Sequence, residues 1–368
     1  MPDSAKSQTR LGNLDLLRLL AALMVVFYHY TYSGYASHGL SPTAFPELAP
    51  FTQHLWAGVS LFFMISGFVI AYSAEKSPAY DFAVSRIARL YPAFLICLTL
   101  TSVVAILAGP QNFEVFQITP MRWLANLTMA PMIFKQPFVD GVYWSILVEI
   151  TFYGWVALLV AAGVFQRYQL RIIAIWLAVS LLNEFVLESA VMNKLFITRY
   201  ACYFVLGILS YRVFAANRMP TFAEWALGVL SLLMSLKSDH HVQTWIQLNY
   251  LFSAEWNLWL SLAKTIAFVA VLNLAIRRAP ILSTARCAVL GGLTYPLYLL
   301  HASIGFVLFH HFHETANRWL MLTCIFVLML VLSYAVFRFV EPPGRKLILK
   351  TGRDLRFRTR DSSEQALS

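Results

Sequence analysis

Long apolar runs constrain this chain more than any other feature of its sequence. A helix that crosses a bilayer needs about 20 consecutive apolar residues, with a range of roughly 17 to 25. Only 12% of the residues are charged, against about 25% in soluble domains, and 59% are hydrophobic. We therefore predict an all-α fold, a polytopic integral membrane bundle of about ten transmembrane helices. The predicted spans are 14–34, 55–74, 86–108, 142–163, 170–188, 196–214, 222–237, 258–276, 289–311 and 319–340.

The basic residues predict the orientation of these spans. Cytoplasmic loops of membrane proteins carry an excess of Lys and Arg. Most of the 28 basic residues fall in alternate loops, on the same side as both ends of the chain. Both termini are therefore expected in the cytoplasm. The same distribution explains the net charge of +10, because short basic loops contact anionic lipid headgroups. The charge is therefore no sign of nucleic-acid binding.

Three regions are expected along the chain. Residues 1–13 form a cytoplasmic N-terminal segment, 14–342 a membrane domain and 343–368 a basic, polar cytoplasmic tail. The tail past Gly352 has the composition of a disordered segment. Two long outer loops, 35–54 and 109–141, are candidates to shape a site; the apolar stretch 122–134 is too short to span and is expected to be interfacial or re-entrant. The four cysteines lack the spacing of metal ligands or disulfides and are expected to be apolar fillers, and no metal is predicted.

Ionisable groups in the first span mark a candidate site. An ionisable side chain at bilayer depth is costly, so each one is a functional hypothesis. His29 follows Arg18 by eleven positions, close to three helical turns, so both project from one face. Asp15 lies one turn from Arg18 on nearly the same face. His29 is expected about 8 Å below the outer end of the span.

Polar groups of the fourth, eighth and ninth spans are expected at a similar depth. In the fourth span Glu149 lies about 10 Å from the outer end, where a carboxylate must be paired or protonated. The polar positions of these spans are Trp144, Ser145, Glu149 and Tyr153 in the fourth, Lys264 in the eighth, and Tyr295, Tyr298 and His301 in the ninth. Tyr295, Tyr298 and His301 share a face, either as a substrate site or as a hydrogen-bonded helix interface. Lys264 either lines a site or extends toward the outer surface.

Two arginines one turn apart stand at the predicted cytoplasmic end of the third span. Arg86 and Arg89 face the same way, and such a pair can contact phosphate groups through parallel hydrogen bonds. Positive charge at a cytoplasmic end explains the pair equally well on its own. The residues alone favour this second explanation.

Six motifs in order resemble those of the acyltransferase-3 family of membrane acyltransferases. The motifs are Arg18 with His29, GVSLFFMISGF from Gly58, Arg86-x-x-Arg89 before Tyr91-Pro92, Trp144-Ser145-x-x-x-Glu149, Tyr295-x-x-Tyr298-x-x-His301 and Glu341-Pro342. Each motif alone is weak, but together they cover nearly the whole chain. One position departs from the pattern, since Ser60 stands where many relatives have Asp. An acidic role at that position is therefore in doubt.

The resemblance implies a ten-span enzyme that uses acyl-CoA and acylates extracytoplasmic carbohydrate. It implies that Arg18 and His29 are essential and that Arg86 and Arg89 bind the phosphates of the CoA. Acetyl-CoA is the expected donor, with succinyl-CoA an alternative. The chain is expected to sit in the inner (plasma) membrane as a multi-pass protein. A separate hydrolase-like domain, which some relatives carry after the membrane domain, is not expected here.

A mechanism follows as an expectation. His29 would act as general base on the acceptor hydroxyl, and Glu149 would orient the imidazole and stabilise its cation. Tyr298 or His301 would donate a hydrogen bond to the developing oxyanion. Acyl transfer to His29 itself is the less favoured variant.

Two other classes of function remain open at this point. A proton-coupled transporter also needs intramembrane His, Glu and Arg, although the sequence has no internal repeat or paired broken spans. A non-catalytic subunit of a polysaccharide assembly complex would tolerate loss of His29. For the enzyme, the expected partners are acyl-CoA, a carbohydrate acceptor and membrane lipids, and polysaccharide assembly proteins are candidate partners.

Overall fold

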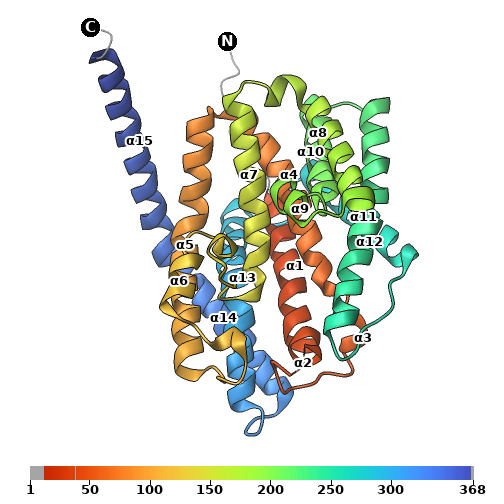
Figure 1. Ribbon diagram of the computed structural model, residues 1–368, viewed down its shortest axis with the longest axis vertical. Helices are drawn as coiled ribbons and strands as arrows, with labels where there is room; N and C mark the ends of the chain where they lie inside the picture. The colour runs from red at the N-terminus through yellow and green to blue at the C-terminus, as the bar shows by residue number, and fades with distance from the viewer. Residues whose placement is uncertain (1–11, 38, 366–368) are drawn as a thin grey trace. The chain divides into compact units, whose positions relative to one another are not determined.

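The structure, a computed structural model, describes residues 12–37 and 39–365 of the chain, and side chains up to residue 356. Helices of α, 3-10 and π type account for its regular structure, and no strand occurs among the described residues (Figure 1). The prediction of an all-α bundle is therefore confirmed. The predicted N-terminal segment falls mostly on residues 1–11, which lie outside the described part.

Eight helical stretches of the described chain are long and apolar enough to cross a membrane, which makes the protein polytopic. They are Gly12–Ala36, Ala49–Lys76, Ala79–Ala108, Gly141–Ala161, Phe165–Leu187, Leu258–Arg277, Thr284–Phe312 and Arg318–Arg356. The other two predicted spans are also helices. Helix α10 (Ala201–Ala216) has only 16 residues, and α11 (Phe222–Asn249) has 28 but carries Glu224, Lys237 and Asp239. By length and composition the structure thus supports eight of the ten predicted spans.

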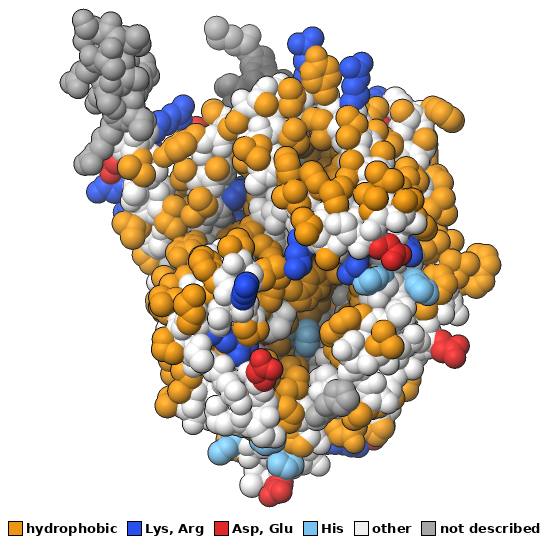
Figure 2. Space-filling view, viewed as in Figure 1, with side chains coloured by type: hydrophobic (Ala, Val, Ile, Leu, Met, Phe, Trp, Pro, Cys, Tyr) orange, Lys and Arg blue, Asp and Glu red, His pale blue; other side chains and the backbone are white. Residues whose placement is uncertain are grey.

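Large apolar side chains lie on the outside of these helices as well as inside. Ile106 of α5, Leu158 of α7, Ile175 of α8 and Val331 of α14 are each more than half exposed. Figure 2 shows hydrophobic side chains spread widely over the visible face, with few charged groups between them. Such a surface needs hydrocarbon rather than water around it.

The chain divides into two compact units. Unit 1 comprises Met1–His38, Phe45–Ala71 and Ile173–Thr294, and unit 2 comprises Gly39–Ala44, Tyr72–Ile172 and Tyr295–Ser368. Unit 1 contains α1 (Gly12–Tyr28), the π turn η1 (His29–Ser33), most of α4 (Gly58–Lys76), α10, α11 and α12 (Leu258–Arg277). Unit 2 contains α5 (Ala79–Ala108), α7 (Trp144–Ala161), most of α13 (Thr284–Phe312), α14 (Arg318–Ala335) and α15 (Glu341–Gln365).

Glycines allow α4 and α10 of unit 1 to cross at backbone contact. A Cβ atom at Gly67 would meet the carbonyl of Phe204, and one at Gly207 would meet the carbonyl of Met64. Small residues at such crossings let two helices approach without a side chain between them. The spacing of small residues in GVSLFFMISGF therefore serves packing.

A single amide fixes the start of α1 to the end of α12. Nδ2 of Asn13 lies 3.1–3.2 Å from the carbonyls of Ala275, Arg278 and Ala279, and its Oδ1 accepts from the amide of Ile281. The last carbonyls of a helix have no partner within the helix, so an amide from outside stabilises that end. Asn13 thus anchors the helix that carries Arg18 and His29.

Helix α5 of unit 2 begins earlier than predicted. It starts at Ala79, whereas the predicted span starts at residue 86. Arg86 and Arg89 therefore lie about two to three turns inside a continuous helix rather than at its end. The prediction placed the boundary where charged side chains begin, but Asp81, Arg86 and Arg89 do not end the helix.

The segment 109–140 is held together by a buried guanidinium. Arg122, which is 4% exposed, donates to the carbonyls of Glu114 and Gln117 at 3.0 and 2.9 Å and to that of Phe138. The segment contains only short helices: η3 (Glu114–Phe116), α6 (Pro120–Asn126) and η4 (Pro131–Phe134). As predicted, the stretch 122–134 does not form a spanning helix.

The predicted disorder after Gly352 is wrong for the described residues. Helix α15 continues to Gln365 and packs along α5 (Figure 1). The Tyr80 hydroxyl donates to the carbonyl of Gly352 at 2.7 Å, and Arg356 forms a two-pronged ion pair with Asp81. These contacts with a distant helix fold a segment whose own composition is polar.

The glycine crossing gives a prediction about stability. Gly67→Ala and Gly207→Ala should each cost about 1–3 kcal/mol, because the new methyl group meets backbone that cannot move aside. Thermal unfolding of the purified protein measures the effect. Gly228→Ala in α11 is the matched control, since its Cβ would find only Leu209, at 3.9 Å, and Ala favours a helix over Gly. Equal melting temperatures in all three variants would contradict the role given to the crossing.

Candidate active site

A π turn carries the first candidate residue of unit 1. The first helix is α-helical from Gly12 to Tyr28 and then forms η1 from His29 to Ser33. The regular helix between Arg18 and Tyr28 is the geometry from which the shared face of Arg18 and His29 was predicted. Single π turns within α-helices occur often at functional sites. His29 is the first residue of this one.

The hydrogen bond of the His29 ring defines its tautomer. Nδ1 lies 2.8 Å from the carbonyl of Val25. A carbonyl oxygen only accepts, so Nδ1 carries the proton in the neutral ring and Nε2 carries the lone pair. Nε2 is therefore the atom of His29 that could take a proton from a hydroxyl.

Hydroxyl groups fasten the π turn to the segment that follows α11. The Tyr32 hydroxyl donates to the carbonyl of Phe252 at 2.7 Å. The hydroxyls of Ser33 and Tyr28 lie 2.8 and 3.1 Å from that of Tyr250. Tyr28 and Tyr32 are almost fully buried. These contacts hold an irregular turn in one conformation and so restrict the position of His29.

Arg18 lies against Asp15 on the first helix. Its Nη1 is 3.3 Å from Oδ1 of Asp15, and both side chains are largely buried. Gly291 packs directly on Asp15, so that a Cβ there would come within 2.6 Å of the carboxylate. This acidic neighbour holds the Arg18 guanidinium within unit 1.

Lys264 does not extend to the surface but forms a buried ion pair. Its ammonium group contacts the Asp239 carboxylate and lies 4.6 Å from the centre of the Trp56 ring. Asp239 is 1% exposed and also accepts from the Tyr203 hydroxyl at 2.6 Å. Of the two alternatives for Lys264, extension toward the outer surface is therefore wrong.

This cluster also bears on the departure at Ser60. The Ser60 hydroxyl lies within hydrogen-bonding reach of the Tyr203 phenol, which in turn donates to Asp239. A carboxylate is therefore present beside Ser60, but it belongs to α11 and reaches Ser60 through the Tyr203 phenol. Sequence analysis missed Asp239 because the seventh span was ended at residue 237, whereas α11 continues to Asn249.

In unit 2, hydrogen bonds join the start of α7 to α13. Asp140 caps the 3-10 turn η5 (Gly141–Tyr143) that leads into α7, accepting from the amide of Val142 at 3.1 Å and from that of Ser303 at 2.8 Å. Burial raises the pKa of the Asp140 carboxyl, and these amides oppose that shift. The Tyr143 hydroxyl donates to the carbonyl of Leu299 at 3.2 Å. Trp144 and Ser145 follow directly, so the cap sets the level of this motif beside α13.

The Tyr298 hydroxyl is engaged within the fold. It lies 2.6 Å from the Ser145 hydroxyl and 3.3 Å from the carbonyl of Val142. Ser145 can itself donate to Val142 at 3.0 Å, which leaves its oxygen to accept from Tyr298. The helix-interface alternative therefore describes Tyr298 well. Tyr295 differs, because its buried hydroxyl has no hydrogen-bond partner among the described residues.

His301 is fully buried in α13. Its Nδ1 lies 2.9 Å from the carbonyl of Tyr298 and 3.1 Å from that of Leu297. The ring proton is therefore on Nδ1, and Nε2 of the neutral ring accepts rather than donates. Donation to an oxyanion from Nε2 would require the imidazolium form. Within this motif, the neutral donor without a partner is Tyr295.

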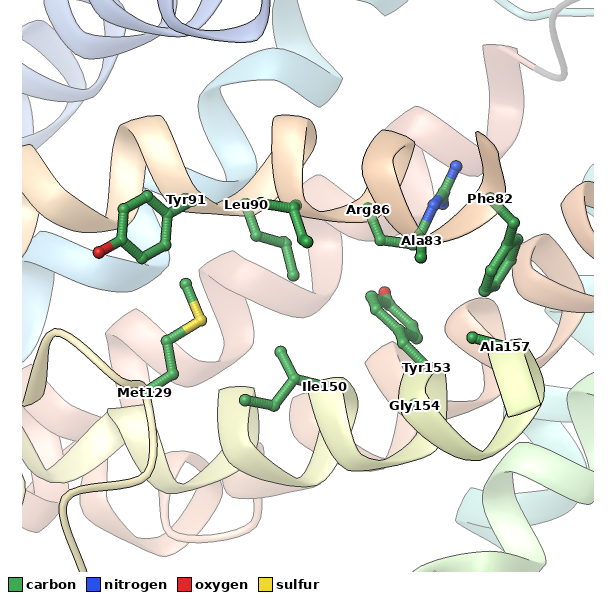
Figure 3. A pocket seen from close by; sticks show the side chains of 11 residues that line it. Phe82, Ala83, Arg86, Leu90, Tyr91, Met129, Ile150, Tyr153, Gly154 and Ala157 are labelled. Carbon is green, nitrogen blue, oxygen red and sulfur yellow. The ribbon is translucent and has the colours of Figure 1, made fainter. Parts of the chain in front are cut away.

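Arg86 and Tyr153 line a groove between α5 and α7 (Figure 3). The Tyr153 hydroxyl donates to the Glu149 carboxylate, one turn away. Arg86 lies close enough to Glu149 for their opposite charges to attract one another. The groove encloses about 230 Å³ and, apart from Arg86 and two tyrosines, is lined by apolar side chains. Arginine, carboxylate and phenol thus form one polar group at the edge of an apolar groove.

The family comparison decides the class of protein. A family model described as an acyltransferase domain matches residues 11–338, most of the chain. The chain belongs to the acyltransferase-3 family. The match favours the acyltransferase over the transporter and scaffold alternatives.

Two curated proteins are similar to this acyltransferase. Nodulation protein 10 of Rhizobium leguminosarum bv. viciae is 27% identical over 315 residues, which cover 79% of this chain and 77% of that protein. An O-acetyl transferase of Shigella phage Sf6 is 38% identical over 89 residues, 24% of each chain. No solved structure matches the chain.

The candidate residues of this acyltransferase therefore form groups within each unit. In unit 1, Arg18 and His29 share α1 and its π turn, and Lys264 is paired with Asp239. In unit 2, Ser145 and Tyr298 are hydrogen-bonded, Arg86 and Tyr153 line one groove, and Tyr153 donates to Glu149. The expected action of Glu149 on His29 joins residues of the two units and stays a prediction.

The buried ion pair gives a prediction that does not depend on activity. Asp239→Asn and Lys264→Met should each destabilise the protein by roughly 3–5 kcal/mol, because each leaves an unpaired buried charge. The double variant should lose less free energy of unfolding than the sum of the losses in the two single variants. Thermal unfolding and folded yield measure these differences. Arg356→Met, which breaks the exposed pair with Asp81, is the control and should cost less than about 1 kcal/mol. Single variants no less stable than this control would contradict the pairing.

Proposed function

We propose that this chain is an O-acyltransferase that moves an acyl group from cytoplasmic acyl-CoA to a hydroxyl of a carbohydrate outside the inner (plasma) membrane. The observation that carries the proposal is the orientation of the His29 ring. Its ring is held by Val25 so that Nε2 bears the lone pair, within a hydrogen-bonded π turn of a family member. The acceptor is a lipid-linked or polymeric glycan, and polysaccharide assembly proteins are candidate partners.

In the proposed reaction, Nε2 of His29 takes the proton of the acceptor hydroxyl as its oxygen attacks the thioester carbonyl. A carbon–oxygen bond forms and the carbon–sulfur bond breaks. The thiolate leaves and takes up the proton from the imidazolium, which restores the neutral ring. No oxidant or metal ion is needed for this balance.

Other residues support these steps. Arg86 and Arg89 bind the phosphates of the donor, since arginine contacts phosphate through parallel hydrogen bonds. Arg18, on the same helix as His29, guides the thioester toward Nε2. The partnerless Tyr295 hydroxyl is better placed than Tyr298 or His301 to donate to the oxyanion, because donation by Tyr295 breaks no existing bond.

The acyl group is proposed to be acetyl. The phage relative bears the name O-acetyl transferase, which supports the smaller group. Lys264 was the residue that could have received the carboxylate of a succinyl group. Its ammonium already contacts Asp239, which weakens the case for succinyl-CoA.

A surface-glycan measurement tests the proposal. Mass spectrometry of glycans from cells with wild-type protein should show a mass increment that is absent without the protein. His29→Ala should reduce the increment roughly 10²–10⁴-fold, the usual contribution of a general base. His311→Ala, an exposed histidine of α13, is the matched control and should leave the increment unchanged at equal membrane abundance. A wild-type increment that persists in His29→Ala would exclude the proposed base.

A second prediction concerns Glu149. Glu149→Gln should lower the rate constant by roughly 10²–10⁴-fold if the carboxylate stabilises the imidazolium of His29. Tyr153→Phe removes one hydrogen bond to that carboxylate and should lower the rate by roughly tenfold. Rates with purified protein, acetyl-CoA and the identified acceptor give the ratio. If Glu149 acts through His29, the double variant with His29→Ala should be little slower than His29→Ala alone. Additive losses would mean that Glu149 acts independently.

A further inference from the structure

The antiparallel packing of α15 on α5 places a third arginine beside Arg86 and Arg89. A Cβ at Gly344 would lie 2.5 Å from Pro92, and one at Gly352 would lie 2.7 Å from Val84. The step of eight residues from Gly344 to Gly352 along α15 therefore corresponds to the step of eight residues from Pro92 back to Val84 along α5. In this register Arg345 lies at the level of Tyr91, within one turn of Arg89.

The charges around Arg345 form a cluster of four. Arg345 and Arg89 each lie close enough to Arg86 and to Glu341 for their charges to act on both. The residues come from two elements of unit 2, the first half of α5 and the start of α15. Arg89 and Arg345 are exposed, whereas Arg86 and Glu341 are partly buried. Arg89 and Arg345 thus act on the Glu341 carboxylate, and Arg86 adds a third cation, so that positive charge stays in excess even with Glu149 beside Arg86.

Positive charge that only anchors the cytoplasmic end of a span does not need to be gathered into such a cluster. Positive residues near a membrane surface are normally spread among loops, where they repel one another little. Here three guanidinium groups are gathered by a helix packing that two glycines and the Tyr80 hydroxyl maintain. A rigid group of arginines suits a ligand with several phosphates, because each guanidinium can make two parallel hydrogen bonds.

We propose that Arg345 completes a three-arginine site for the phosphate groups of acyl-CoA, and that Glu341 is the internal counter-ion of that site when no donor is bound. The inference rests on the proposed function, from which it takes the identity of the polyanion. In the empty site, the Glu341 carboxylate offsets part of the charge of Arg89 and Arg345. Donor phosphates compete with it for the same guanidinium groups.

The binding of coenzyme A to the purified protein in lipid nanodiscs tests the proposal without measuring acyl transfer. Arg345→Gln should raise the Kd for coenzyme A roughly tenfold or more, because a charged hydrogen-bonding partner is lost. Lys346→Gln makes the same charge change one residue further and is the matched control, with an expected change below twofold. Glu341→Gln should lower the Kd severalfold by removing the competing carboxylate. If Arg345 binds the 3′-phosphate, Arg345→Gln should raise the Kd for dephospho-CoA less than it raises the Kd for coenzyme A.

Each outcome decides between distinct conclusions. Equal Kd values for Arg345→Gln and Lys346→Gln would overturn the role of Arg345, and a higher Kd for Glu341→Gln would overturn that of Glu341. Effects on anionic-lipid binding alone, with no change for coenzyme A, would assign the cluster to lipid headgroups and overturn the proposal. A wild-type protein that does not bind coenzyme A would overturn the donor assignment of the proposed function as well.

Labelling of a cysteine variant after purification separates the effect of charge from any misfolding of Arg345→Gln. Arg345→Cys is labelled after purification with either a cationic or a neutral methanethiosulfonate reagent. The cationic label should restore much of the affinity that the neutral label does not. Three of the four native cysteines are buried and Cys324 is exposed, so wild-type protein treated in the same way is the control. Equal affinity with both labels would overturn the proposal, because only the charge differs within one folded protein.

Discussion

The hydrocarbon of a bilayer contains no water, so a polar group within it must find its partner in the protein. This requirement explains most of the internal contacts. Lys264 is paired with Asp239, the Tyr298 phenol with Ser145, and the Tyr153 phenol with Glu149. Ser145 and Tyr298 are 153 residues apart in the sequence, and Asp239 and Lys264 lie on consecutive helices. Pairing therefore fixes helix positions as well as satisfying polar groups, and the candidate residues are held by the same contacts that stabilise the fold.

The two histidines show how these contacts define chemistry. In both His29 and His301, Nδ1 lies against carbonyls of the preceding turn, so each ring presents Nε2 as an acceptor. Main-chain carbonyls of a helix cannot change their hydrogen-bonding role, so the tautomer is fixed by the fold. His29 differs from His301 in its backbone, because it begins a π turn that tyrosine hydroxyls fasten to the following segment of unit 1. His301 and His29 thus have the same tautomer, but His301 lies within an α-helix and His29 at the start of a π turn.

Sequence patterns predicted what depends on local spacing. Hydropathy located the long apolar helices, although not the polar helix α15, and the depth of Glu149 predicted that its carboxylate must be paired or protonated. Contacts between distant segments were not predictable in this way. Asp239, Asp140 and Arg345 were missed because their partners lie on other elements, and the π turn was missed because apolar periodicity does not record turn size. The start of α5 was placed too late because a change in polarity marks the edge of the hydrocarbon and not the end of a helix.

The packing of α15 on α5 also has a consequence for biosynthesis. Helix α5 emerges from the ribosome about 250 residues before α15. Until then, the face of α5 around Val84 and Pro92 has no covering helix, and Arg86 and Arg89 lack the charge of Arg345 beside them. Contacts of such long sequence separation form late in folding. Chains released before α15 is complete would insert into the membrane with this face bare, which gives quality control a way to distinguish unfinished from finished protein.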